Sequence, residues 1–275
     1  MKLLVHGREA YAYTGGKPFD ATLPCIVFVH GALNDHSVFT LLARWFAHHG
    51  HGVLALDLPG HRRSAGPALT SVEAMADWLL AVMDAAGVQR AALAGHSMGS
   101  LVALQAAGVA PARATHLLML GTAYPMTVAP ALLASALATP LQAIDQVIGW
   151  SFSTLAAKPS YPGPGVWLRG AARALMLQVL QGQGDPRLFH TDFSACHAYA
   201  GAEAAAARMT CPAHLVLGSA DQMTPLRATP ALARMLNASV HHVPAGHQLM
   251  AEAPDPVLLA LRAALKLNAA APAPA

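Results

Sequence analysis

Residues 92–104 read Ala-Leu-Ala-Gly-His-Ser-Met-Gly-Ser-Leu-Val-Ala-Leu, and they carry the strongest structural signal in the chain. Its first residues are short and apolar, as in a buried strand, and its last are apolar at helical spacing. Between them lies Gly-x-Ser-x-Gly, a motif that places a serine on a tight, strained turn between a strand and a helix. Gly95 and Gly99 are needed because a Cβ at either position would collide with the neighbouring strand and helix. The motif predicts that the Ser97 hydroxyl is a nucleophile and that the Met98 N–H faces the atom under attack.

A second interpretation of the same five residues stays open at this point. Two glycines around a serine also arise by chance in a glycine-rich chain, where the serine only caps a helix that follows a strand. The assignment of Ser97 therefore depends on what the rest of the chain provides.

Length and composition favour one domain, or one domain with a sizeable insertion. The chain has 275 residues, of which 55% are hydrophobic and 11% charged, so much of it must be interior. The net charge of +3 is not gathered into basic runs, and we expect no nucleic-acid partner. No apolar run reaches the roughly 18 residues of a membrane span, and the N-terminal apolar run is too short for a signal peptide. We therefore expect no membrane segment.

Cysteine and histidine usage gives two further expectations. The three cysteines are scattered and form no Cys-x-x-Cys pair, which suits a reducing cytoplasm; they are Cys25, Cys196 and Cys211. The cluster of His48, His49 and His51 lacks the spacing of a metal site and is interpreted as a solvated turn. We predict no metal and no cofactor.

The first half of the chain alternates strand and helix patterns. After a hairpin over 3–14, buried strands are expected over 25–30, 53–57, 92–94 and 115–121, with helices over 37–48, 71–87 and after Ser97. This order predicts a mostly parallel sheet with helices on both faces.

The alternation stops near Thr122 and resumes after a purely helical region. Helices are expected over 128–139, 141–155 and 170–180, and then strands over 213–218 and 240–243 with helices over 230–236 and 255–267. An Ala/Pro tail over 268–275 is expected to be disordered. The sequence thus predicts an α/β core, residues 1–122 and 205–275, interrupted by a helical cap, residues 123–204.

A serine nucleophile needs a histidine as base, and the histidine needs a carboxylate that fixes its tautomer. In this architecture the acid and then the histidine follow the serine, each on a loop after a strand. Asp221 and His247 stand at those two places, and no acidic residue ends the strand before Asp221. The alternatives, a helix N-cap for Asp221 and a turn residue for His247, do not explain why the two occur in this order after Ser97.

Two backbone donors are expected to form an oxyanion hole, which stabilises the negative oxygen of the reaction intermediate. One is the Met98 N–H, and the other comes from the loop after residues 25–30, where we choose the Ala32 N–H and keep Leu33 as the fallback. His30 is expected to brace this loop. The His96 ring is expected to line the pocket or to form a local hydrogen bond.

With these motifs in place, the chain resembles the α/β-hydrolase superfamily, in its form with a helical cap. The matching segments are His30-Gly31, Asp57-Leu58-Pro59-Gly60-His61-Arg62-Arg63-Ser64, Gly95-His96-Ser97-Met98-Gly99, Gly218-Ser219-Ala220-Asp221 and Gly246-His247. The resemblance implies the α/β-hydrolase fold and acyl-enzyme chemistry. Two departures are visible: Arg62 replaces the usual glycine, and the oxyanion loop lacks the Gly-Pro segment of relatives that cleave carbon–carbon bonds. Serine at position 97 argues against relatives that open epoxides or remove halide, which use aspartate there.

The predicted cap is rich in apolar residues and should choose the substrate. Leu33, His96, Trp150 and Phe152 are candidate substrate-binding residues, and since the last two lie two apart in one expected helix, at most one should line the cleft. We predict hydrolysis of a small to medium apolar carboxylic ester. Thioester, lactone or carbon–carbon cleavage, acyl transfer and perhydrolysis need the same groups and stay open, as does a non-catalytic receptor.

Overall fold

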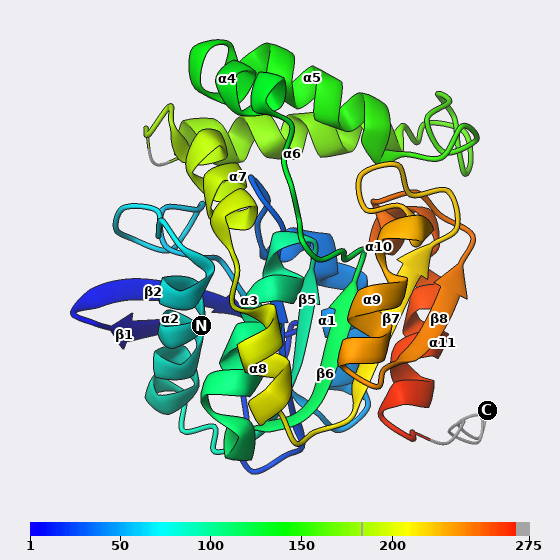
Figure 1. Ribbon diagram of the computed structural model, residues 1–275. Coiled ribbons are helices and arrows are strands. Elements are labelled where there is room, and N and C mark those ends of the chain that lie inside the picture. Colours follow the sequence, from blue (N-terminus) through cyan, green and yellow to red (C-terminus); the bar gives the residue numbers. More distant parts are fainter. Residues whose placement is uncertain (183, 268–275) are drawn as a thin grey trace.

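A computed structural model describes residues 1–182 and 184–267 of the chain (Figure 1). The tail predicted over 268–275 lies outside the described residues. In the described part an eight-stranded sheet has the strand order β1-β2-β4-β3-β5-β6-β7-β8. The strands are β1 (Lys2–Val5), β2 (Arg8–Tyr13), β3 (Cys25–Val29), β4 (Gly52–Leu56), β5 (Ala91–His96), β6 (Ala114–Leu120), β7 (Ala213–Gly218) and β8 (Ser239–Val243).

The sheet is mostly parallel, as the alternation of strands and helices predicts. β3 to β8 pair in parallel, whereas the N-terminal hairpin adds β1 and β2 in antiparallel orientation. Every residue of β3, β4 and β5 is buried, which explains why these strands are continuous apolar runs rather than alternating ones. The strand order reverses between β3 and β5, the place where open parallel sheets bind ligands at their carboxyl ends.

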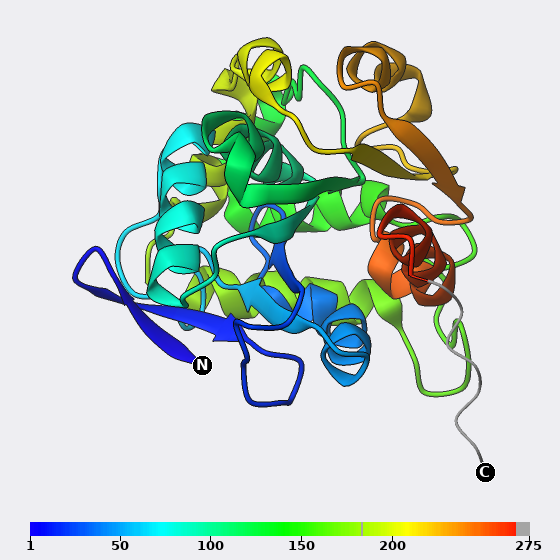
Figure 2. The same cartoon turned by 90° about the horizontal axis from the view of Figure 1, so that it is seen from below.

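Helices cover both faces of the sheet (Figure 2). Successive side chains of β3 point to opposite faces: Val27 packs in the layer with α2 and α3, and Phe28 in the layer with α1 and α11. The core helices are α1 (Thr40–His48), α2 (Val72–Ala85), α3 (Met98–Val109), α8 (Ala202–Arg208), α9 (Pro230–Met235), α10 (Leu249–Glu252) and α11 (Pro254–Ala264), with 3-10 turns at His36–Phe39, Pro111–Arg113 and Leu226–Ala228.

Four further helices form a layer over the edge of the sheet at which β5 ends (Figure 1). We call this layer the cap; its helices are α4 (Pro130–Ala138), α5 (Pro140–Ser151), α6 (Leu168–Gly182) and α7 (Leu188–Ala198). The helix expected to run to residue 155 ends at Ser151, because the carbonyl of Ser151 accepts hydrogen bonds from the core rather than from a further turn. Phe152 is therefore an extended residue after the helix.

The chain returns from the cap to the core before α8. A Cβ added at Gly108 of α3 would lie 2.5 Å from the Cα of Ala205, so α8 packs directly on α3. On this contact we place the end of the cap before Ala202, a few residues earlier than the expected boundary at 204. None of the helices in the described ranges has both the length and the apolar character that a membrane crossing requires.

Candidate active site

Ser97 lies on a strained turn between β5 and α3. Its φ of 53° and ψ of −119° are values that residues with a Cβ rarely adopt. A Cβ at Gly95 would lie 1.9 Å from the carbonyl oxygen of Gly99, and a Cβ at Gly99 would lie 2.1 Å from the carbonyl oxygen of Val29. These contacts are the physical reason for both glycines of the motif, because the turn, the strand and the helix touch through their backbones.

A buried histidine and a buried aspartate lie together on the loops after β8 and β7. The Nδ1 atom of His247 is 2.9 Å from Oδ2 of Asp221. The carboxylate also accepts hydrogen bonds from the N–H groups of Met223 and Thr224 and from the Thr224 hydroxyl, at 2.7–2.8 Å. Asp221 thus fixes Nδ1 of His247 as the protonated nitrogen and leaves Nε2 as the basic one.

The ionisation of Asp221 is decided by these partners. Burial alone would raise the pKa of Asp221, but the charge on His247 and the hydrogen bonds from His247 and Thr224 hold that pKa well below its ordinary value. The carboxylate is therefore ionised at every pH at which His247 can act as a base.

Ser97 and His247 line the same pocket, which has a volume of about 170 Å³. Ala32 of the loop after β3 lines it too, together with side chains from the cap. Ser97 and His247 come from segments 150 residues apart in sequence, and the parallel sheet brings them to one edge. The neighbouring Met98 is the first residue of α3, so its N–H belongs to the end of the helix that lacks internal acceptors.

The loop after β3 turns tightly beside Ser97. A Cβ at Gly31 would lie 3.1 Å from the Cβ of Ser97, so a larger residue would crowd Ser97 and glycine eases the close approach of the loop. The Asn34 N–H donates to the carbonyl of Gly31 at 3.3 Å, and Leu33 has a φ of 51°. This is the pattern of a type II turn, whose third residue needs a positive φ.

Within this turn the backbone N–H groups have different partners. The Leu33 N–H donates to Oδ2 of Asp192 at 2.8 Å. Leu33 is fully buried and does not line the pockets described here. Since the Leu33 N–H already has a carboxylate acceptor, the Ala32 N–H is the better candidate for the second oxyanion donor.

Two buried histidines next to the site are neutral and structural. His30 donates from Nδ1 to the carbonyl of Gly31 at 2.8 Å and accepts at Nε2 from the Leu58 N–H at 3.1 Å, so it braces the loop. His96 donates from Nε2 to the carbonyl of His247 at 2.9 Å and lines a small pocket at Ser97. Burial, assisted by a neighbouring histidine, lowers the pKa of each ring to about 3.

The cap supplies the apolar wall of the pocket. Trp150 lines it and is 37% exposed, whereas Phe152 is 3% exposed and packs in the core of the molecule. Other apolar lining residues are Met126, Val128, Leu132, Phe193 and Cys196. Among the described residues that line this pocket, none carries a carboxylate, an ammonium or a guanidinium group.

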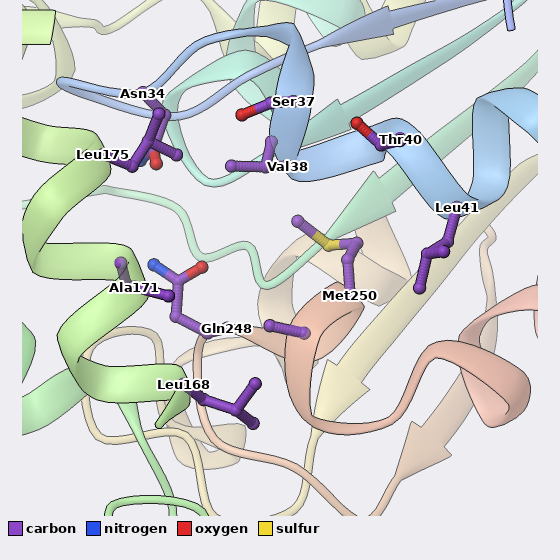
Figure 3. Close-up of a pocket in the computed structure, with 12 residues that line it drawn as sticks. Asn34, Ser37, Val38, Thr40, Leu41, Leu168, Ala171, Leu175, Gln248 and Met250 are labelled. Carbon is purple, nitrogen blue, oxygen red and sulfur yellow. The ribbon is translucent and has the colours of Figure 1, made fainter. Parts of the chain in front are cut away.

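A second pocket, of about 300 Å³, adjoins the site between α6 and the core (Figure 3). Asn34 and Gln248 line both this pocket and the small pocket at Ser97. On the cap side the wall is formed by Leu168, Ala171 and Leu175 of α6. Two amide side chains therefore lie at the boundary between the small pocket at Ser97 and a larger, neutral pocket.

The end of cap helix α5 is hydrogen-bonded to the loop that carries His247. The N–H groups of His247 and Gln248 both donate to the carbonyl of Ser151, at 2.8 and 3.1 Å. The carboxylate of Glu252 accepts from the N–H groups of Gly246 and Ser153, at 3.1 and 3.2 Å. The backbone of the histidine loop is thus fixed partly by the cap.

One group of potential metal ligands occurs in the described ranges, and it is part of a hydrogen-bond network. Asp57 accepts from the backbone and ring of His36 at 2.8 and 2.7 Å, while Asp35 caps the Ser37 N–H at 2.8 Å and binds Arg62 at 3.1 Å. Arg62 has a φ of 44°, a conformation that glycine adopts more easily, so the glycine that the family resemblance implies at this position has a physical reason. The network gives these residues a structural role next to the loop after β3.

Two contributors to the site are not among the residues predicted from sequence. Thr224 follows Asp221 by three residues, and that spacing is a usable signal for a side chain that folds back onto the carboxylate. Asp192 contacts Leu33 across 159 residues of sequence, and no local pattern marks it.

A family model described as the alpha/beta hydrolase family matches residues 26–260, and the chain belongs to this family. The enol-lactonase from Burkholderia xenovorans LB400 has the same fold, with a TM-score of 0.83 and 21% identity over 97% of this chain and 100% of that one. Among curated proteins, the dihydrolipoyllysine-residue acetyltransferase component of the acetoin cleaving system of Pseudomonas putida is 36% identical over 36% of this chain and 26% of its own length. The sn-1-specific diacylglycerol lipase ABHD11 of Mus musculus is 37% identical over 31% of this chain and 28% of its own length. The chain thus aligns with only about a quarter of the length of these curated relatives.

Proposed function

We propose that the protein is a serine hydrolase that cleaves carboxylic esters through an acyl-enzyme intermediate. The observation that carries the proposal is the strained Ser97 turn, which shares a pocket with His247, itself hydrogen-bonded to the buried Asp221. A serine, a base and an orienting carboxylate at one sheet edge are what acyl transfer requires. The similarity to a lipase and to the fold of a lactonase agrees with this reaction class.

In the first half-reaction Ser97 Oγ attacks the ester carbonyl carbon. His247 Nε2 takes the hydroxyl proton while the carbonyl π electrons move to the oxygen, which the N–H groups of Met98 and Ala32 stabilise. When the intermediate collapses, the C–O bond to the alcohol breaks and His247 returns the proton to the leaving oxygen. Asp221 stays ionised throughout and balances the charge of the imidazolium.

In the second half-reaction water takes the place of the alcohol. His247 removes a proton from the water as its oxygen attacks the acyl carbon, and the same two N–H groups stabilise the second oxyanion. The collapse of this intermediate releases the carboxylic acid and returns the proton to Ser97.

The substrate class follows from the pockets. The pocket at Trp150 is apolar, has no charged lining residue among the described ones, and at about 170 Å³ is smaller than the roughly 300 Å³ of a drug-sized site. We propose that it takes a short apolar acyl group, and that the alcohol part of the ester lies outside it. The pocket of Figure 3 adjoins the nucleophile through Asn34 and Gln248 and would take a longer group on the other side. The free thiols of the three cysteines suit a cytoplasmic location, which we include in the proposal.

The test is rapid-mixing kinetics with p-nitrophenyl esters, together with a panel of matched thioesters and lactones. We expect a burst of p-nitrophenol that approaches one equivalent per enzyme when deacylation is slow, and the highest kcat/KM on esters with short acyl groups. If kcat/KM were higher on thioesters or lactones, the bond that is cleaved would be revised to that type, and the acyl-enzyme mechanism would be retained. Binding of an ester without burst or turnover would mean a receptor, and would contradict the proposal.

A further inference from the structure

Asp192 of cap helix α7 is a fully buried carboxylate that contacts the core. Its Oδ2 accepts hydrogen bonds from the Leu33 N–H at 2.8 Å and from Nε2 of His61 at 3.0 Å. Oδ1 is also buried and accepts no hydrogen bond from the described residues. A carboxylate withdrawn from water in this way is expensive unless its partners compensate for the lost hydration.

The geometry makes His61 the compensating charge. Its Nδ1 is 3.2 Å from the carbonyl oxygen of Pro59 and its Nε2 is 3.0 Å from Asp192, so both ring nitrogens face acceptors. Only the doubly protonated ring donates from both nitrogens. Burial alone would lower the pKa of His61, but the charge and hydrogen bond of Asp192, together with the Pro59 carbonyl and the charge of Asp57, raise it above its ordinary value. The His30 ring, whose centroid is 4.8 Å away, is neutral, so the positive charge lies on His61.

The hydrogen bond to Asp192 holds Leu33 in a conformation that its side chain disfavours. Leu33 has a φ of 51°, and the turn from Gly31 to Asn34 depends on that value. If the acceptor is lost, Leu33 can return to a negative φ, which rotates the peptide between Ala32 and Leu33. That rotation changes the ψ of Ala32 and swings its carbonyl away from the Asn34 side-chain amide, which donates to it at 2.9 Å. It therefore disturbs the backbone of the residue beside Ser97 whose N–H is the candidate oxyanion donor.

The ion pair supplies the acceptor without adding net negative charge to the loop. A lone carboxylate beside the oxyanion loop would oppose the negative oxygen that forms there, because charges interact strongly at short range in a buried site. The positive charge of His61 cancels this repulsion. Asp192 and His61 together therefore suit a site at which a second negative charge develops.

We propose that Asp192 and His61 are positioning residues for the oxyanion hole, and that through them the cap sets the position of the Ala32 N–H. The proposal rests on the ester hydrolysis proposed above. It means that the cap takes part in catalysis as well as in substrate choice, although neither residue touches the substrate.

The test compares Asp192→Ala and Asp192→Asn with the wild type. A short p-nitrophenyl ester gives kcat and KM, and a trifluoromethyl ketone gives Ki, because its adduct with a serine places an oxyanion in the hole. For Asp192→Ala we expect kcat to fall by about 10- to 100-fold, KM to stay within about twofold, and Ki to rise as kcat/KM falls. The kcat and Ki of Asp192→Asn should lie between those of the wild type and those of Asp192→Ala, because the amide oxygen still accepts from the Leu33 N–H.

Asp145→Asn is the matched control. Asp145 is another cap aspartate with an ion-pair partner, Arg173, but it is exposed and contacts neither the loop nor the pockets. Its kcat and Ki should equal those of the wild type. A general disturbance of the cap would change this variant as well, and such a change would contradict a specific role for Asp192.

Two results would overturn the proposal. One is a folded Asp192→Ala variant with wild-type kcat and Ki, and the other is a rise in KM with Ki unchanged, which belongs to a substrate-contacting residue. If Asp192→Ala does not fold, Asp192→Asn and His61→Gln decide the matter by the same criteria. A wild type that neither turns over esters nor binds the ketone contradicts the proposed function instead, so the two failures are distinguishable.

Discussion

The histidine loop of the core and the apolar wall of the cap hold their residues in different ways. His247 is fixed by directional contacts: its ring binds Asp221, its N–H binds Ser151 and its carbonyl accepts from His96. Trp150 of the cap, in contrast, is 37% exposed and lines the pocket as part of an apolar wall. Directional contacts tolerate little change in geometry, whereas an apolar wall can be reshaped at small cost. Substitutions in the two regions should therefore differ in kind: loss of reaction in the histidine loop, altered selectivity in the apolar wall.

The largest effect is expected for Ser97→Ala, which removes the proposed nucleophile. Turnover of any ester should fall by at least about 10⁴-fold, and a fluorophosphonate probe should no longer label the protein. Intact-mass spectrometry after labelling measures this, with Ser135→Ala in the cap as the control that retains the label. Labelling of the Ser97→Ala variant would mean that another residue is the nucleophile.

The next largest effect is expected for Asp221→Asn. The amide cannot hold His247 in the right tautomer, so kcat should fall by about three to four orders of magnitude while the fold is retained. Steady-state kinetics and circular dichroism measure the two properties. Near-normal kcat in this variant would show that a different carboxylate orients the histidine.

The pH dependence separates the base from its carboxylate. Only neutral His247 accepts a proton from Ser97, so kcat/KM should fall about tenfold per pH unit on the acid side of one ionisation. The pKa of Asp221 is held below its ordinary value, so the stability it contributes is fully present above about pH 4 and is lost only as the pH falls further. Activity should therefore disappear, reversibly, at a pH where circular dichroism still reports the folded protein. Loss of activity and of fold at the same pH would contradict this separation.

In the cap, Trp150→Ala and Phe152→Ala should have opposite consequences. Trp150 lines the pocket, so its removal should shift the preference among acetate, butyrate and octanoate esters by about tenfold. Phe152 is 3% exposed, so its removal should lower the free energy of unfolding by about 3–5 kcal/mol and leave the preference unchanged. kcat/KM across the ester series and denaturant titration measure the two effects. The same shift in ester preference from both variants would contradict the assignment of Trp150 to the pocket wall and of Phe152 to the core.

The smallest effect is expected for Ala171→Trp, which fills the pocket of Figure 3. Esters of long-chain alcohols should lose severalfold in kcat/KM, and methyl esters, which do not reach beyond Gln248, should be unaffected. Matched acetate esters of methanol and octanol provide the comparison. An equal loss of kcat/KM on both esters would indicate that the substitution distorts the cap, and not that it blocks the pocket of Figure 3.

Local constraints made much of the fold and of the candidate site predictable. Gly95 and Gly99 flank a serine whose turn admits no Cβ on either side, and buried parallel strands leave continuous apolar runs in the sequence. Asp221 and His247 could be proposed because a parallel sheet brings the ends of its strands together. The contact between Asp192 and Leu33 could not, since it depends on how the cap packs on the core. The end of α5 could not be predicted either, because it depends on the hydrogen bonds that the Ser151 carbonyl accepts from a distant part of the chain.

The hydrogen bonds of Ser151 bear on whether the cap is an exchangeable module. Recombining this core with the cap of a relative, or grafting this cap elsewhere, would replace one side of the two backbone hydrogen bonds that join the end of α5 to His247 and Gln248. The bonds would form again only if the new backbone followed the same path. The carboxylate of Glu252, which joins the same two segments, would lose its Ser153 partner at the same seam. A chimera built at the sequence boundaries of the insertion would thus exchange part of the support of His247 along with the pocket wall. A transferable unit must include residues 151–153 and 246–252 together, although almost a hundred residues separate them along the chain.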